Sequence, residues 1–140
     1  MSRIFWDTNL FIYLIEPSAN LHAQVADLRR AMIDRGDQLI TSAMSLGEVL
    51  VKPIERKDGA LAAKYEQAIA STSLVVPFDV HAARIYASLR SDRSLRPPDA
   101  IQLACAAAAR VDLFITNDER LTTKRVIGVQ FIVSLDRAPL

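Results

Sequence analysis

Short apolar runs alternate with segments of helical periodicity along the whole chain, and this alternation limits the possible folds more than any other feature. Five runs are typical of buried strands: residues 4–6, 38–41, 74–76, 113–116 and 129–133. The segments between them carry apolar residues three or four positions apart, the spacing of amphipathic helices. Strands separated by helices predict an α/β fold with a central parallel sheet wrapped by helices.

The ends of several expected helices are marked by residues that begin or end helices. Residues 7–9 (Asp-Thr-Asn) supply a helix start, and Gly36 closes a helix whose apolar residues begin at Leu21. Pro97 and Pro98 suit the first turn of a helix. The remaining helices are expected at about 44–52, about 58–71, 82–89 and 99–110, with a short helical turn between the last two strands.

Length and composition indicate one soluble domain spanning residues 1–140. The chain is 51% hydrophobic and 24% charged, the balance of a globular protein. No apolar run approaches the roughly 20 residues that cross a bilayer, and the first residues do not resemble a signal peptide, so we expect a cytoplasmic protein with no membrane contact.

Cysteine, histidine and net charge exclude other classes of site. Cys105 has no disulfide partner and lies in an Ala-rich segment, so we expect a buried thiol rather than a nucleophile. His22 and His81 lie far apart without cysteine neighbours, which excludes a zinc site. The net charge of +1 means that any binding of nucleic acid depends on a local basic patch.

Four acidic residues occupy positions where parallel sheets carry their functional sites. Asp7 follows the first expected strand and Asp118 follows the fourth, while Asp99 opens the helix that leads into that fourth strand. Glu48 lies in the helix after the second strand, at the edge of its apolar arc, and is expected to be half turned toward the core. Sites in such folds form beyond the carboxyl ends of the strands.

Each acid alone also has a simpler explanation. Asp7 and Asp118 are ordinary helix caps or turn residues, Asp99 suits the first turn of a helix, and Glu48 is a solvated helix residue in that view. Together, however, carboxylates gathered at one end of a sheet repel one another unless a cation joins them. Because no histidine or thiolate accompanies them, the preferred ion is Mg²⁺ or Mn²⁺.

Four short segments resemble the signature segments of PIN domains and occur in the order of that family. They are FWDTN at 5–9, SLGEV at 45–49, PDAIQLA at 98–104 and ITND at 115–118. The resemblance covers essentially the whole chain. With almost nothing added to the domain, the chain is most similar to the VapC-type toxins of toxin–antitoxin pairs.

This resemblance implies a metal-dependent endoribonuclease that hydrolyses RNA phosphodiester bonds in line, leaving a 5′-phosphate and a 3′-hydroxyl. It also implies a small antitoxin protein as partner and a homodimer. The catalytic and metal-binding acids would be Asp7, Glu48, Asp99 and Asp118. The supporting polar residues would be Thr8, Asn9, Thr116 and Asn117. Glu119 is the only candidate for the further acid that some relatives carry after the fourth segment.

A basic run precedes the third signature segment and is the candidate RNA-binding surface. It consists of Arg84, Arg90, Arg93 and Arg96. Such a run commonly forms a solvated helix face, but phosphate contacts also supply most of the affinity for RNA. Arg96 directly precedes Pro97-Pro98-Asp99, so this surface would lead to the acids.

Three other functions stay open at the level of sequence. A PIN domain that matures RNA as a housekeeping nuclease would carry the same residues, and a neighbouring antitoxin gene would distinguish the two. A noncatalytic PIN-fold interaction module would keep the fold, although idle clustered acids would only reduce stability. A phosphorylated receiver domain needs adjacent acids after its first strand and a lysine after its last, and both are missing.

Overall fold

Five parallel strands form the central sheet of this protein. The computed structural model describes residues 1–139, so Leu140, the last residue of the expected domain, lies outside the described part. The strands are β1 (Arg3–Trp6), β2 (Gln38–Ser42), β3 (Leu74–Val76), β4 (Val111–Thr116) and β5 (Val129–Ser134). Their spatial order is β3-β2-β1-β4-β5, and every pair is parallel. The predicted α/β fold with a parallel sheet is confirmed.

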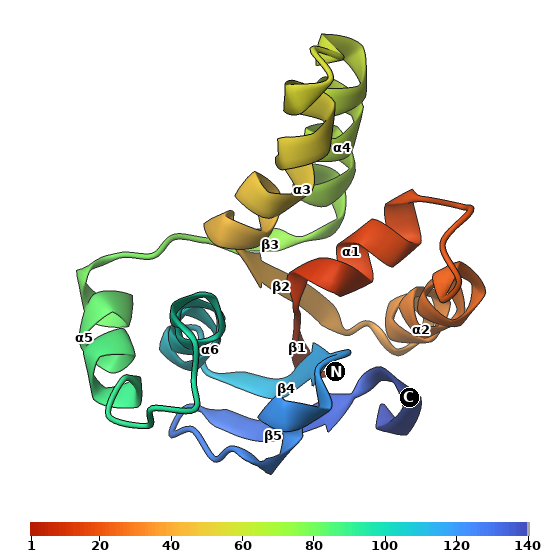
Figure 1. Cartoon of the computed structure of the whole chain (residues 1–140). Helices are drawn as coiled ribbons and strands as arrows, with labels where there is room; N and C mark the ends of the chain where they lie inside the picture. The colour runs from red at the N-terminus through yellow and green to blue at the C-terminus, as the bar shows by residue number, and fades with distance from the viewer. Residues whose placement is uncertain (140) are drawn as a thin grey trace.

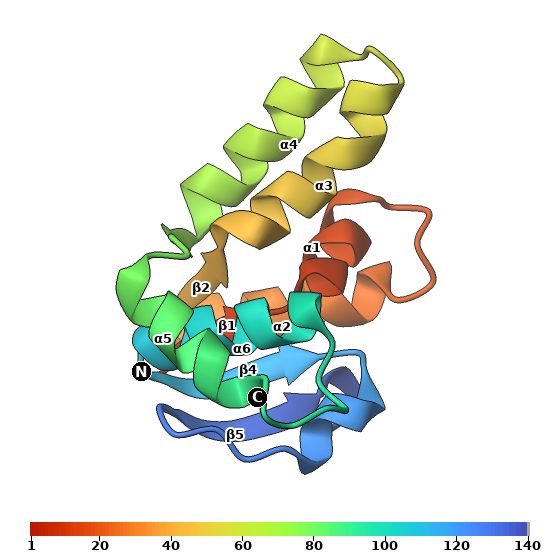
Figure 2. The same cartoon turned by 60° about the vertical axis from the view of Figure 1, so that its left-hand side comes forward.

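Six helices surround the sheet, as expected from the alternating pattern. They are α1 (Thr8–Ile15), α2 (His22–Arg35), α3 (Ala43–Glu55), α4 (Gly59–Thr72), α5 (Val80–Leu89) and α6 (Pro97–Ala108). Helices α1 and α2 lie on one face of the sheet and α5 and α6 on the other (Figures 1 and 2). Helices α3 and α4 form a hairpin that projects away from the sheet (Figure 1). Within residues 1–139, every helix is too short or too polar to cross a membrane.

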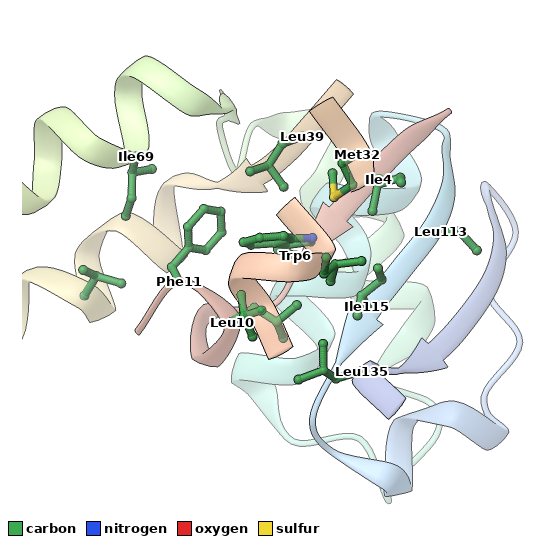
Figure 3. Packing of buried hydrophobic residues seen from close by; sticks show 13 residues of the cluster. Ile4, Trp6, Leu10, Phe11, Met32, Leu39, Ile69, Leu113, Ile115 and Leu135 are labelled. Atoms are coloured by element: carbon green, nitrogen blue, oxygen red, sulfur yellow. The ribbon is translucent and has the colours of Figure 1, made fainter. Parts of the chain in front are cut away.

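Successive side chains of β1 point to opposite faces of the sheet and so belong to two separate hydrophobic clusters. Trp6 packs on the α1 and α2 side, where its ring lies 5.3 Å from that of Phe11, and Figure 3 shows Met32 and Ile115 on the same side. Phe5 points to the opposite face and stacks on Phe114 with ring centroids 5.1 Å apart. A strand buried on both faces is typical of a parallel sheet covered by helices.

The pairing of β1 with β4 places two of the signature segments side by side. Trp6 lies in register with Ile115, and the backbone N–H of Asp7 donates to the Ile115 carbonyl at 3.0 Å. The carboxyl ends of both strands therefore meet at one edge of the sheet. Residues 7–9 and 116–118 begin at this edge.

Two helices and one small element differ from the sequence-based expectations, and one of these helices, α6, spans Pro97–Ala108 where 99–110 was expected. Helix α3 was expected to end near Lys52 but continues through Pro53 to Glu55. A proline inside a helix removes one backbone hydrogen bond. Pro53 is buried, and packing of α3 against α4 offsets this loss. The expected helical turn before the last strand is the 3₁₀ helix η1 (Glu119–Thr123), whereas a second 3₁₀ helix, η2 (Leu135–Arg137), was not predicted.

Candidate functional site

Asp7 links the end of β1 to the start of α1 and is the most enclosed of the four acids. Its Oδ1 accepts a hydrogen bond from the backbone N–H of Thr8 at 2.8 Å, so it also caps α1. Its Oδ2 accepts from the Thr116 hydroxyl at 2.9 Å. Burial raises the pKa of Asp7, the hydrogen bonds oppose this rise, and the nearby charge of Glu48 adds to it.

Glu48 is an exposed residue of α3, but the tip of its side chain reaches the buried Thr8, in keeping with a residue half turned toward the core. Its backbone lies at the edge of the apolar arc, but its carboxylate extends toward α1. There, Oε1 accepts a hydrogen bond from the Thr8 hydroxyl at 2.6 Å. Because Thr8 is buried and follows Asp7 directly, its hydroxyl holds Glu48 near Asp7.

Asp99 lies in the first turn of α6, behind the two prolines that begin this helix. Its side chain is half-buried. Partial burial is the largest cause that raises the pKa of Asp99, followed by the charges of Asp7 and Asp118, while Arg120 and Arg96 oppose the rise. Asp99 is therefore repelled by two of the other predicted acids, Asp7 and Asp118, at this edge of the sheet.

Asp118 caps η1 and is paired with Arg120, a residue that the sequence analysis did not single out. Arg120 Nε lies 2.9 Å from Asp118 Oδ1, and its Nη2 contacts Oδ2. This pairing is the main cause that lowers the pKa of Asp118. The only available signal in the sequence was a cation two positions after the fourth acid.

The four acids fit a hard divalent cation by their chemistry, although their side chains are not gathered around one point. Among residues 1–139, no group of three or more His, Cys, Asp or Glu side chains is close enough to enclose a metal ion as the side chains stand. All four candidates offer carboxylate oxygens, the ligands that Mg²⁺ and Mn²⁺ prefer. Both carboxylate oxygens of Asp118 already contact Arg120.

The expected supporting residues divide into two kinds. The hydroxyls of Thr8 and Thr116 donate to Glu48 and Asp7, which is the orienting contact that the resemblance implied. Asn9 is exposed, and Asn117 donates to the Tyr13 hydroxyl at 3.2 Å rather than to an acid. Glu119 is exposed at the start of η1.

The basic run is exposed as a whole, but its members are not equivalent. Arg90 donates to the backbone carbonyl of Leu95 at 2.8 Å and so closes the turn between α5 and α6. Arg96 precedes α6, and its charge lowers the pKa of both Asp99 and Asp118. Arg84 and Arg93 are exposed. Of the four arginines, Arg96 is the one whose charge acts on the acids.

A groove of about 260 Å³ lies between α1 and the α3–α4 hairpin. It is lined by apolar and basic side chains that include Ile12, Lys52, Arg56 and Tyr65, and Glu48 lies on its wall. The groove therefore extends the acidic edge of the sheet along the hairpin.

One polar residue near the acids was missed by the sequence analysis. Gln102 is buried among apolar residues of α6, three residues after Asp99. A single amide in a run of alanine and leucine was the signal, since buried amides need hydrogen-bond partners.

Comparison with known proteins agrees with this architecture. Residues 4–126 match the family model described as the PIN domain. No curated protein sequence matches the chain significantly.

Solved structures with the same fold include VapBC2 from Rickettsia felis bound to a DNA fragment from its promoter, with a TM-score of 0.75 and 14% identity over 94% of this chain and 98% of that one. VapBC-5 from Mycobacterium tuberculosis has a TM-score of 0.64 and 24% identity over 96% and 99%. VapC20 from Mycobacterium tuberculosis, a toxin that cleaves the sarcin–ricin loop, has a TM-score of 0.69 and 15% identity over 90% and 98%. The family match over most of the chain, together with the parallel sheet and its acidic edge, assigns this protein to the PIN-domain family.

Proposed function

We propose that this protein is a metal-dependent endoribonuclease and the toxin of a type II toxin–antitoxin pair. The observation that carries the proposal is that Asp7 and Asp118 both lie near enough to Asp99, at the carboxyl edge of β1 and β4, for their charges to act on it. Glu48 joins them through the Thr8 hydroxyl. Such a concentration of carboxylates opposes folding unless a cation offsets the repulsion. Acids with perturbed pKa values cluster at functional sites.

Under this proposal, Asp7, Glu48, Asp99 and Asp118 hold Mg²⁺ or Mn²⁺. The bound ion would supply Lewis acidity, which activates water and stabilises the charge that develops on a phosphodiester. Thr8 and Thr116 orient two of the carboxylates through hydrogen bonds that are already made. Arg96 adds a positive charge beside the acids, where a phosphate of the RNA backbone would lie.

The toxin assignment rests on the fold, since the solved structures with this fold include toxin–antitoxin complexes. A partner that inhibits this chain would have to reach the acids. The groove beside Glu48 offers a route, with apolar residues such as Ile12 and Tyr65 for a helix and Glu48 for a basic side chain. We propose that a small antitoxin protein occupies it.

Cleavage of RNA by the purified protein tests the nuclease proposal. We expect cleavage with Mg²⁺ or Mn²⁺, none in EDTA, and none by Asp7→Asn with either ion. Glu66→Gln removes an exposed acid on α4 and serves as the matched control, which should cleave like the wild type. Cleavage that persists in EDTA, or in Asp7→Asn with the ion present, would overturn the proposal.

A further inference from the structure

Gln102 is a polar side chain in the interior of α6, whose other residues apart from Asp99 are small or apolar. It is only 3% exposed. Burying an amide without partners is costly, so the free energy of folding depends on where its donors and acceptor are satisfied. Its position one helical turn after Asp99 directs it toward the region between α1 and α3.

The Gln102 amide connects three elements of the fold. Its Oε1 accepts from the Ser42 hydroxyl at the end of β2. Its Nε2 lies 2.7 Å from Ser45 Oγ in α3, 3.1 Å from Thr8 Oγ1 in α1 and 3.4 Å from Asp7 Oδ1. One side chain thus joins the segments that carry Asp7 and Glu48 to the helix that carries Asp99.

The direction of these hydrogen bonds follows from counting hydrogens. A threonine hydroxyl has one hydrogen, and that of Thr8 points to Glu48 Oε1 at 2.6 Å. Thr8 Oγ1 must therefore act as an acceptor toward Gln102, whose NH₂ group provides the donor. Ser42 Oγ accepts from the Ser45 backbone N–H, so its own hydrogen is available for Gln102 Oε1. The two amide hydrogens face three acceptors, of which Ser45 Oγ and Thr8 Oγ1 are the nearer. The opposite orientation of the amide would place Oε1 against Thr8 Oγ1 and Asp7 Oδ1, which have no hydrogen to offer it.

We propose that Gln102 is a positioning residue for the acidic site. By donating to Thr8 and Ser45, it fixes the hydroxyl that holds Glu48 and keeps the start of α1, with Asp7, at a set place relative to α3. This inference rests on the proposed metal-dependent function. Residues that orient metal ligands typically change affinity or activity by about 10- to 100-fold when they are replaced.

The test compares Gln102→Met, which keeps the length of the side chain but removes its donors and acceptor, with the wild type. Mn²⁺ affinity is measured by isothermal titration, and stability by thermal melts in EDTA. We expect the Mn²⁺ dissociation constant to rise about tenfold or more. Leu103→Ala is the matched control, because it removes a buried contact from the next position of α6 without touching the network. It should lower the melting temperature and leave Mn²⁺ affinity unchanged.

A double-mutant cycle with Thr8 separates positioning from mere structural support. Thr8→Val removes the hydroxyl through which Gln102 acts, whereas Thr8→Ser retains it. We expect Thr8→Val to weaken Mn²⁺ binding, Thr8→Ser to restore it, and the double variant with Gln102→Met to add little to either single change. If Gln102→Met does not fold, the Thr8 pair still tests the same hydrogen bonds.

The two levels of the proposal fail in different ways. If the wild type binds no Mn²⁺, the proposed function is overturned and this inference with it. If the wild type binds Mn²⁺ while Gln102→Met, or the Thr8 pair in its place, binds it equally well, only the positioning role is overturned. Equal losses of Mn²⁺ affinity in Gln102→Met and Leu103→Ala would also overturn it, because the effect would then follow stability alone.

Discussion

The guanidinium group of Arg120 donates hydrogen bonds to both carboxylate oxygens of Asp118, and the Arg120 backbone N–H donates to Oδ1 at 3.0 Å as well. The metal-free site therefore carries its own cation at the fourth acid. If Asp118 is a ligand of the proposed metal ion, the ion has to compete with Arg120 for this carboxylate, and the pair would weaken metal binding.

The first prediction concerns the loss of Arg120. Arg120→Ala frees Asp118 and removes a positive charge near Asp99, and both effects favour a cation. We expect Mn²⁺ to bind about threefold more tightly, in keeping with the modest strength of an exposed ion pair. Isothermal titration measures this, with Arg125→Ala as the control for loss of an exposed arginine. Unchanged or weaker binding in Arg120→Ala would show that Asp118 does not contact the ion.

The second prediction concerns Asp99, whose pKa is raised by burial and by two neighbouring acids. Asp99→Asn removes this repulsion, so the metal-free variant should be as stable as the wild type or more stable, by less than about 1 kcal/mol after screening by solvent. The same variant loses a proposed metal ligand, so cleavage should fall by orders of magnitude and Mn²⁺ should stabilise it less. Thermal melts with EDTA and with Mn²⁺ measure both effects. A variant that melts lower in EDTA and still cleaves RNA at the wild-type rate would identify Asp99 as a simple helix-start residue.

The third prediction is a dependence of metal-free stability on pH. Burial raises the pKa of Asp7 in the folded state above its ordinary value of 3.8, so the folded protein takes up this proton before the unfolded chain does. Stability should therefore increase as the pH falls from neutral through the raised pKa toward the ordinary one. Urea melts in EDTA at a series of pH values measure this increase, and Asp7→Asn should reduce it while Glu66→Gln should not.

The lowered pKa of Asp92 has the opposite effect on stability and limits the pH range over which the increase due to Asp7 is seen. Hydrogen bonds from Ser94 and from Lys124 lower the pKa of Asp92 to about 2. A carboxyl group whose pKa is lowered by folding stabilises the folded protein at pH values above its ordinary pKa. This contribution is lost as the pH falls toward 2. The increase in stability due to Asp7 should therefore be measured at pH values above the ordinary pKa of aspartate. Stability that stays flat from neutral pH down to that value would contradict the prediction for Asp7.

The fourth prediction concerns RNA binding. Replacing Arg93 and Arg96 together by alanine should raise KM and flatten the salt dependence of RNA affinity, because fewer counterions are released. Arg90 is left in place since it closes a turn. Arg137→Ala, an exposed arginine on η2, is the control. Wild-type KM and salt slope in the double variant would make the basic run an ordinary solvated surface.

The fifth prediction tests the toxin assignment in cells. Expression of the chain alone should arrest growth, because an unrestrained ribonuclease depletes RNA, and Asp7→Ala should relieve the arrest. Growth curves with equal protein levels, checked by immunoblot, provide the measurement. Equal growth with both versions would remove the toxin assignment but leave the nuclease proposal to be decided by the cleavage assay.

Local sequence determined the elements and the edge where the site lies. The five strands and the helices between them follow from apolar spacing, and the capping residues Asp7 and Gly36 mark real helix ends. Burial on a sheet or along one side of a helix imposes a period on the sequence, so these features are legible without a structure. The extension of α3 through Pro53 was missed because packing against α4 overrides a local preference.

The contacts within the site were decided only by the tertiary structure. The sequence predicted that Glu48 is half turned toward the core, but it did not predict the hydrogen bond to its carboxylate from Thr8 in α1, 40 residues away. The role of Gln102 depends on hydroxyls on three other elements, among them those of Thr8 and Ser45, 94 and 57 residues away in the sequence. Hydrogen bonds between side chains depend on ångström-scale placement of whole helices, which is the sum of all the packing in the core. A sequence records which groups can pair, and the packed fold decides which of them meet.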